Sequence, residues 1–198
     1  MPENRIMNIG ITGNIGSGKS SFCACLEALG YKVYYADLIA NRMLPELSPF
    51  LRKRWGDAVF SGQNPDRLRI AEIVFNQPQE LAYLNSILHP LVVAEVDRLL
   101  SEPSAKARFF EIPLLFEASL EDRFDFIVLV RSPLELVIER IKQRNPDSWE
   151  NQIKRLEQQM PDYQKATMVD MVIENDEDLE KLKNAAVMLI EQIEDLNK

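Results

Sequence analysis

A glycine-rich loop lies near the start of the chain, between an apolar run and a stretch of helical spacing. Residues 13–20 read Gly-Asn-Ile-Gly-Ser-Gly-Lys-Ser and match the phosphate-loop pattern G-x-x-x-x-G-K-[ST] at every defined position. Residues 6–12 are mostly apolar and β-branched, which predicts a buried strand, and residues 19–29 have the spacing of a helix. A phosphate loop between a strand and a helix predicts the nucleotide-binding core of an α/β protein.

The residue types of this loop suit the phosphates of a nucleoside triphosphate. Glycines let the backbone turn so that successive N–H groups point at an anion, and the following helix adds the partial positive charge of its N-terminus. Lys19 would contact the β- and γ-phosphates, and the Ser20 hydroxyl would bind Mg²⁺. The expected ligands of the nucleotide are Gly13, Asn14, Ile15, Gly16, Ser17, Gly18, Lys19, Ser20 and Ser21.

The rest of the chain alternates strand and helix patterns except in its middle. Strand-like apolar runs occupy residues 31–35, 107–112, 124–130 and 168–173. Helical spacing occupies residues 132–144, 148–165 and 178–196. The alternation predicts a parallel sheet covered by helices, whereas residues 44–106 have helical spacing interrupted by prolines and predict a mainly helical insertion.

Local signals predict where several helices begin and end. Gly30 suits the end of the helix that follows the loop, and Ser132 with Pro133 suits the N-cap and first position of a later helix. Pro90 disfavours the α conformation at His89, the residue before it. The last helix carries one apolar stripe, which consists of Leu179, Leu182, Ala186, Leu189, Ile190 and Ile193.

Charge and composition exclude several functions. The formal net charge of −8 is poorly suited to broad binding of nucleic acid, although a local basic site can still bind a small anion. No apolar run reaches the length of a membrane span, and residues 1–5 show no secretory signal pattern. We interpret Cys23 and Cys25 as reduced core residues, which favours a cytoplasmic protein.

Two large classes of phosphate-loop protein do not fit this sequence. The chain lacks the N-K-x-D and D-x-x-G motifs of a GTPase, and its candidate strands end in Glu111 and Arg131 rather than in the Asp of motor and transport ATPases. Small-molecule kinases remain. They need a second substrate, a group that orients or deprotonates its hydroxyl, and positive charge around the moving phosphoryl group.

Candidate groups for this chemistry follow the second strand and lie in a later helix. Asp37 comes just after residues 31–35 and would accept a hydroxyl proton or hold a metal-bound water, or it would cap a helix that begins near Leu38. Arg140 and Arg144 share one helix face, which would either bind phosphate or form a solvated basic surface. Further basic residues follow at Lys154, Arg155 and Lys165.

A series of short motifs continues the loop pattern along nearly the whole chain. They are residues 9–20, Tyr-Ala-Asp-Leu-Ile-Ala at 35–40, Asp66-Arg67, Ile-Val-Phe at 73–75, His89-Pro90, Ile-Pro-Leu-Leu-Phe-Glu at 112–117, Arg140, Arg144, Arg155, Gln159, Lys165, Asp170 and Ile-Glu-Asn at 173–175. In type and order these marks resemble the dephospho-CoA kinase family. The resemblance implies an enzyme that transfers the γ-phosphate of ATP to the ribose 3′-hydroxyl of dephospho-CoA, giving CoA and ADP, the last step of CoA biosynthesis.

The resemblance also implies a fold and a set of residue roles. The implied fold is a five-stranded parallel sheet flanked by helices, with a helical substrate-binding insertion and a helical lid. Asp37 is implied as the general base, with Lys19 and Arg140 as further catalytic residues, and Ser20 keeps its role as the Mg²⁺ ligand. Arg144 and the helix after it are implied to cover ATP.

The same resemblance divides the chain into parts. Residues 1–44, 107–140 and 166–198 are implied to form the nucleotide-binding core, residues 45–106 the CoA-substrate insertion, and residues 141–165 the lid. The implied partners are the small molecules ATP and dephospho-CoA, with no nucleic acid and no membrane. Positions that depart from the family pattern are Asn14, Ser21, Val137 and Tyr35, the last standing where the family commonly has another Asp.

Two other functions remain open at this point. A kinase of a nucleoside or of another small alcohol would use the same loop and lid, and a nucleotide-binding regulatory module would keep the loop without catalysis. The presence of Asp37 counts against the regulatory module. A screen of phosphate acceptors separates the other kinases from a kinase of dephospho-CoA.

Overall fold

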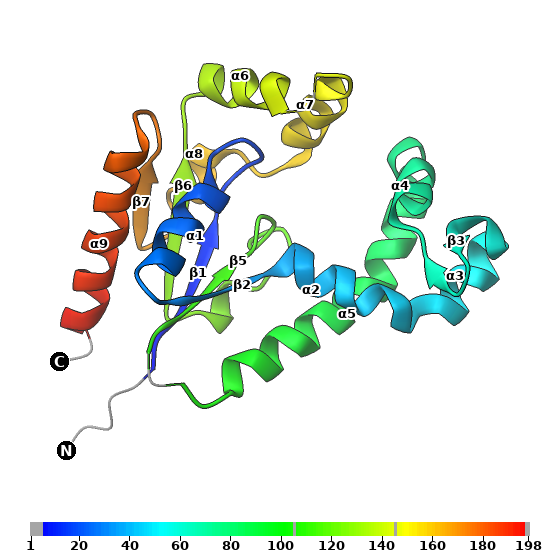
Figure 1. Cartoon of the computed structure of the whole chain (residues 1–198), viewed down its shortest axis with the longest axis horizontal. Coiled ribbons are helices and arrows are strands. Elements are labelled where there is room, and N and C mark those ends of the chain that lie inside the picture. The colour runs from blue at the N-terminus through cyan, green and yellow to red at the C-terminus, as the bar shows by residue number, and fades with distance from the viewer. Residues whose placement is uncertain (1–5, 105, 145, 197–198) are drawn as a thin grey trace. The chain divides into compact units, whose positions relative to one another are not determined.

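The computed structural model describes residues 6–104, 106–144 and 146–196, and the chain divides into two compact units. The sheet unit consists of Met1–Tyr35 and Pro103–Lys198, and the helical unit consists of Ala36–Glu102. Figure 1 labels the helices and strands of both units. The expectation for residues 1–5 lies outside the described residues.

The sheet unit is built on a five-stranded parallel sheet with the strand order β2-β5-β1-β6-β7. The strands are β1 Asn8–Thr12, β2 Lys32–Tyr35, β5 Arg108–Glu111, β6 Phe126–Arg131 and β7 Met171–Glu174. Strand β1 lies at the centre, between β5 and β6. The predicted α/β fold and parallel sheet are therefore confirmed, and the carboxyl ends of β5, β1 and β6 meet at one edge, where such sheets bind ligands.

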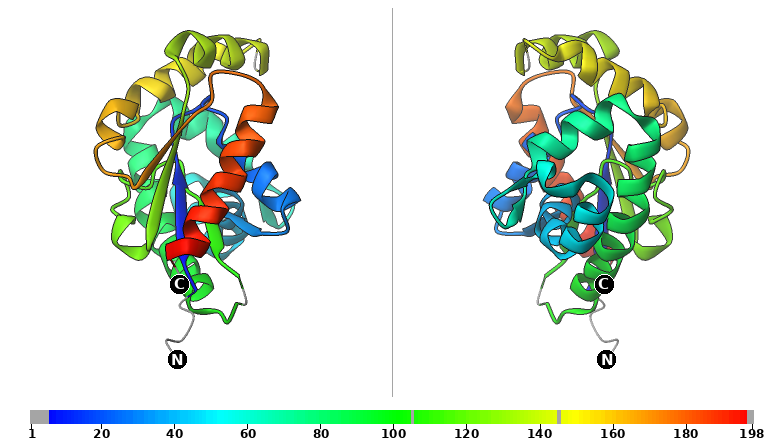
Figure 2. Two further views of the ribbon diagram at one scale, coloured as in Figure 1. Left: turned by 90° about the vertical axis from the view of Figure 1, so that its left-hand side faces the viewer. Right: turned by 90° about the vertical axis from the view of Figure 1, so that its right-hand side faces the viewer.

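Helices flank this sheet and complete its core. They are α1 Lys19–Ala28, η3 Glu121–Arg123, α6 Leu134–Arg144, α7 Trp149–Gln158, α8 Asp162–Lys165 and α9 Leu179–Leu196. Helix α1 packs against α9, and Figures 1 and 2 show α9 (red) running along the strands. The apolar side chains of α1, α9, β1 and β6 form one buried cluster. Among the described residues, none of the helices has the length and apolar character needed to cross a membrane.

The apolar stripe of α9 is confirmed except at its first residue. Leu182, Ala186 and Leu189 are buried, as predicted, whereas Leu179 is 56% exposed. Helical side chains point toward the N-terminus of their helix, so the first residue of α9 points beyond the helix end instead of onto the sheet.

The helical unit has the mainly helical character that its spacing predicts. Its elements are α2 Ala36–Met43, η1 Leu44–Leu47, α3 Ser48–Trp55, η2 Gly56–Val59, β3 Phe60–Ser61, β4 Asn64–Pro65, α4 Arg67–Asn76 and α5 Pro78–Ser101. This unit includes α2, which packs along α5. The short antiparallel pair of β3 and β4 was not predicted, since strands of this length carry no alternating pattern.

Proline 90 does not interrupt its helix. Helix α5 is continuous through Pro90, and His89 is helical, so the expected departure from the α conformation is wrong. Buried apolar residues lie on both sides of this position, Leu84 before it and Val96 and Leu99 after it. Their packing offsets the backbone hydrogen bond that proline cannot donate.

Candidate active site

The phosphate loop occupies the predicted place, between the end of β1 and the start of α1. Two of its glycines have no substitute. Gly13 has φ 143° and a side chain there would overlap the carbonyl oxygen of Val130, while Gly18 has φ 90° and a side chain there would overlap the Asn175 amide. Only glycine adopts these backbone angles readily and leaves this space to its neighbours.

Lys19 is buried at the first position of α1, inside the loop. Its Nζ donates a hydrogen bond of 3.0 Å to the Asn14 carbonyl and lies 3.9 Å from Glu111 Oε1. Glu111 is buried at the end of β5, the strand next to β1. Its carboxylate therefore faces the cation of the phosphate loop. Glu111 did not fit the Asp pattern of motor and transport ATPases, and only the strand order places it beside the loop.

The oxygen donors at this edge of the sheet suit Mg²⁺. Ser20 follows Lys19 in the first turn of α1 and is exposed, so its hydroxyl is accessible to an ion. Glu111 adds a carboxylate next to the loop lysine. Hydroxyl and carboxylate oxygens are the ligands that Mg²⁺ prefers, together with waters and phosphate oxygens. The residues present thus fit the ion that the resemblance implies.

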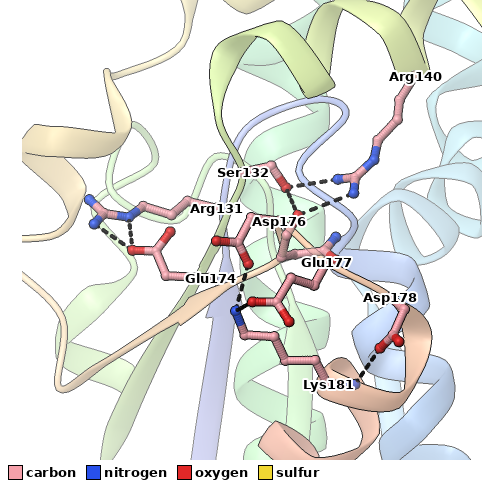
Figure 3. Close-up of polar contacts among 9 residues, drawn as sticks. Arg131, Ser132, Arg140, Glu174, Asp176, Glu177, Asp178 and Lys181 are labelled. Carbon is pink, nitrogen blue, oxygen red and sulfur yellow. Dashed lines mark hydrogen bonds and ion pairs between the residues drawn. The ribbon is translucent and has the colours of Figure 1, made fainter.

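Ser132 does not cap α6, and that prediction is wrong. Its Oγ lies 3.1 Å from the Ser17 carbonyl and 2.6 Å from the Asn175 carbonyl, so its one proton is shared between them. The same oxygen accepts a 2.8 Å hydrogen bond from Arg140 Nη1 (Figure 3). The Ser132 hydroxyl therefore contacts residues that are distant in the sequence instead of capping the N-terminus of α6.

Helix α6 brings Arg140 to the phosphate loop. Its Nη1 lies 3.8 Å from the point that a Cβ would occupy at Gly18, and its Nη2 donates to the Asn175 carbonyl at 3.1 Å. Arg144 lies at the exposed end of the same helix, and Lys154 and Arg155 are exposed on α7. Arg140 thus contacts Ser132 and Asn175 beside the loop, whereas the other basic residues of this face are exposed.

The stretch predicted as one helix over residues 148–165 is two helices, α7 and α8. The turn between them contacts the phosphate loop: Ile15 N–H donates to Gln159 Oε1 at 2.8 Å, and Asn14 Nδ2 donates to the Met160 carbonyl at 3.2 Å. Pro161 cannot continue α7, and these hydrogen bonds bind the turn to the loop instead. The expected lid thus contacts two of the loop residues directly.

The buried Lys165 forms an ion pair with the exposed Glu117 beside this turn. Its side chain is 0% exposed, its Nζ lies 3.1 Å from Glu117 Oε1, and it donates to the Pro113 carbonyl at 3.2 Å. Glu117 also accepts the Met160 N–H at 2.9 Å. Glu117 therefore pairs with Lys165 and holds the turn before α8. Lys165 is not part of a solvated basic face.

We expect Glu117→Gln to lower the free energy of unfolding by about 3 kcal/mol, since it leaves the fully buried Lys165 ammonium without its counter-charge. The matched control is Glu180→Gln, because the pair of Lys183 with Glu180 is exposed at both ends. This control should lower the free energy of unfolding by less than about 1 kcal/mol. Urea denaturation measures both values, and equal losses would contradict the structural role of Lys165.

The carboxyl of Asp162 lies among cations at the start of α8. Burial raises its pKa, and the charges of Lys165, Lys19 and Arg131 oppose this rise without cancelling it. A raised native pKa means that ionised Asp162 costs stability at neutral pH, and that this cost disappears as the pH falls below the ordinary carboxyl range.

We therefore expect Asp162→Asn to raise the unfolding midpoint at pH 7, with a difference from the wild type that shrinks toward pH 4. Asp176→Asn is the opposite control, because the hydrogen bond from Lys181 lowers the pKa of Asp176. That change should lower the midpoint at pH 7. Thermal unfolding at several pH values checks both, and a lower midpoint for Asp162→Asn at pH 7 would contradict the assignment.

Asp37 lies within the first turn of α2, which begins at Ala36. It is therefore not the N-cap of a helix starting near Leu38, and that alternative is wrong. The residue is exposed and follows Tyr35, the last residue of β2, by two positions along the chain. The Asp37 carboxylate is therefore not used to cap this helix, a role that would have competed with accepting a hydroxyl proton.

Tyr35 does not supply the carboxylate that the family commonly has at this position. It packs against the buried cluster of the sheet unit, and its hydroxyl is hydrogen-bonded to Glu27 of α1. Burial raises the pKa of the Tyr35 hydroxyl, so it stays neutral at physiological pH. The position where the family commonly has another Asp thus belongs to the core.

A phosphate loop at the end of the central strand of a five-stranded parallel sheet, with a basic helix beside it, defines a phosphate-loop kinase. A shikimate kinase from Acinetobacter baumannii shares the fold, with a TM-score of 0.55 at 15% identity. The family model described as dephospho-CoA kinase matches residues 7–181. The chain belongs to this family.

Relatives support the same assignment. A dephospho-CoA kinase of Thermus thermophilus is 38% identical over an alignment of 189 residues, which covers 93% of this chain and 91% of the relative. One of Fusobacterium nucleatum is 35% identical over 89% of this chain and 93% of its own. Among solved structures, a dephospho-CoA kinase from Campylobacter jejuni has a TM-score of 0.74 at 29% identity, covering 96% of this chain and 98% of that one.

Proposed function

We propose that this protein transfers the γ-phosphoryl group of ATP to the ribose 3′-hydroxyl of dephospho-CoA, giving ADP and CoA in the last step of CoA biosynthesis. The observation that carries the proposal is the phosphate loop around the buried Lys19, in a chain that belongs to the dephospho-CoA kinase family. The phosphate loop indicates the nucleotide, and membership of the family indicates the acceptor. The free, buried Cys23 and Cys25 suit an enzyme that works in the cytoplasm.

The phosphates of ATP would lie against the backbone N–H groups of residues 13–21. Lys19 would leave the Asn14 carbonyl for the β- and γ-phosphates, which are stronger acceptors because they are charged. Arg140, beside Gly18, would offset charge on the transferring group. Arg144 and residues 141–165 would cover the nucleotide and exclude water, which otherwise competes as an acceptor.

Mg²⁺ would be held by the Ser20 hydroxyl, with the Glu111 carboxylate binding the ion or one of its waters. When bound, the ion neutralises charge on the β- and γ-phosphates. The protein's own part is to place these oxygens at the carboxyl ends of β1 and β5, next to the ammonium of Lys19.

Asp37 would act as the general base. The 3′-oxygen of the acceptor forms a bond to the γ-phosphorus, the bond from that phosphorus to the β–γ bridging oxygen breaks, and the hydroxyl proton passes to the Asp37 carboxylate. The exposed position of Asp37 at the start of α2 leaves it accessible to a substrate. Residues 45–106 would bind the rest of the dephospho-CoA molecule.

An acceptor screen tests this function. The purified chain is incubated with ATP and Mg²⁺ and with dephospho-CoA, adenosine, shikimate or gluconate in turn, and products are identified by mass spectrometry. We expect CoA from dephospho-CoA and no phosphorylated product from the others. Phosphorylation of another alcohol without any CoA would overturn the proposal, as would tight ATP binding with no transfer to any acceptor.

A further inference from the structure

The peptide between Ser17 and Gly18 is held from outside the phosphate loop by two side chains. Asn175 Nδ2 donates a 2.8 Å hydrogen bond to the Ser17 carbonyl, and Ser132 Oγ lies 3.1 Å from the same oxygen. Ser17, Ser132 and Asn175 are all buried. The Ser17 carbonyl is therefore fixed by groups that solvent does not replace.

These two side chains are themselves fixed to the sheet. Asn175 follows β7, and its N–H donates to the Arg131 carbonyl at the end of β6 at 2.8 Å. Its own carbonyl accepts from Arg140 and from the Ser132 hydroxyl. Figure 3 shows Ser132 and Arg140 turned toward each other, with Arg131 and Glu174 paired next to them. The adjacent ends of β6 and β7 thus support the loop.

The direction of the Ser17 carbonyl also determines where the N–H of the next residue, Gly18, points. In a trans peptide the C=O and N–H groups point in opposite directions. Because the Ser17 carbonyl points at Asn175 and Ser132, the Gly18 N–H points away from these two side chains. Backbone N–H groups of such a glycine-rich loop bind phosphate on its concave side.

We infer that Asn175, with Ser132, is a positioning residue that aims the Gly18 N–H at the nucleotide phosphates. Asn175 touches no substrate in this role and acts through the Ser17–Gly18 peptide. It consequently sets the affinity for ATP and ADP and leaves the affinity for the acceptor unchanged. The inference rests on the proposed function only in taking ATP as the phosphoryl donor.

Three variants test the inference. Asn175→Ala removes the amide donor, Asn175→Asp keeps its size but replaces the donor by a carboxylate, and Ser132→Ala removes the second donor. We expect both Asn175 variants to raise the KM for ATP and the Kd for ADP about tenfold or more, and Ser132→Ala to raise them less, because one well-placed donor remains. The KM for dephospho-CoA should change by less than about twofold.

Asn8→Ala is the matched control. The Asn8 side chain accepts a 2.9 Å hydrogen bond from Arg108 at the amino end of β1, far along the strand from the loop. This variant loses an Asn side-chain hydrogen bond in the same unit, so it should lower the unfolding midpoint and leave the Kd for ADP unchanged.

Calorimetry with ADP alone, on variants whose circular dichroism matches the wild type, is the deciding measurement. It needs no acceptor, so it stays informative even if dephospho-CoA proves not to be the substrate. An unchanged Kd for ADP in folded Asn175→Ala would overturn the inference, as would an equal rise for Asn8→Ala or equal rises of both KM values. If Asn175→Ala does not fold, Asn175→Asp and Ser132→Ala decide by the same criteria.

Discussion

Asp37→Asn is expected to lower kcat for the phosphorylation of dephospho-CoA at least about 100-fold, the scale of a lost general base. The amide has nearly the size of the carboxylate but does not accept the proton of the 3′-hydroxyl. In the proposed reaction ATP binds to the loop of residues 13–21 and not to Asp37, so the Kd for ATP should stay nearly unchanged. Steady-state kinetics and calorimetry on the same preparation measure the two quantities.

Asp57→Asn is the control for this change, because Asp57 is an exposed carboxylate of the same helical unit. Its kcat should equal that of the wild type. A kcat for Asp37→Asn within about twofold of the wild type would remove Asp37 from the mechanism. A large rise in the Kd for ATP would instead place Asp37 in nucleotide binding.

Lys19→Met should lower kcat about 100- to 1,000-fold and raise the KM for ATP, because it removes the fixed positive charge next to the transferring phosphoryl group. It should also lower the unfolding midpoint, since the buried Glu111 carboxylate loses its neighbouring cation. The loss of activity and the loss of stability can be separated with the double variant Lys19→Met/Glu111→Gln. Compared with Lys19→Met alone, the double variant should recover part of the unfolding midpoint and none of the activity. Thermal unfolding and steady-state kinetics on the two variants measure these quantities. Full activity in either variant would contradict the role of Lys19.

The parts of the fold that follow from local patterns were predictable. The phosphate loop, the helix that follows it and all five strands of the sheet each carry their signal within a short stretch, as in residues 13–20. The apolar stripe of α9 was predicted by its period, and the helical unit by the helical spacing of residues 44–106.

The parts that depend on strand order and distant contacts were not predictable. Glu111 lies beside the lysine of the phosphate loop only because β5 lies next to β1. Asn175 reaches Ser17 across a separation of 158 residues. Ser132 has the sequence of an N-cap, yet its hydroxyl serves the loop instead, which shows how a tertiary contact overrides a local preference.

The position of the transferred phosphate distinguishes the proposed reaction from phosphorylation of another hydroxyl and from hydrolysis of ATP. The purified chain is incubated with dephospho-CoA, Mg²⁺ and ATP carrying a labelled γ-phosphate, and the product is analysed by phosphorus and proton NMR. We expect one labelled phosphomonoester, coupled to the ribose H3′ of CoA, with an equal amount of ADP. Label on another hydroxyl, or only in inorganic phosphate, would contradict the proposed reaction.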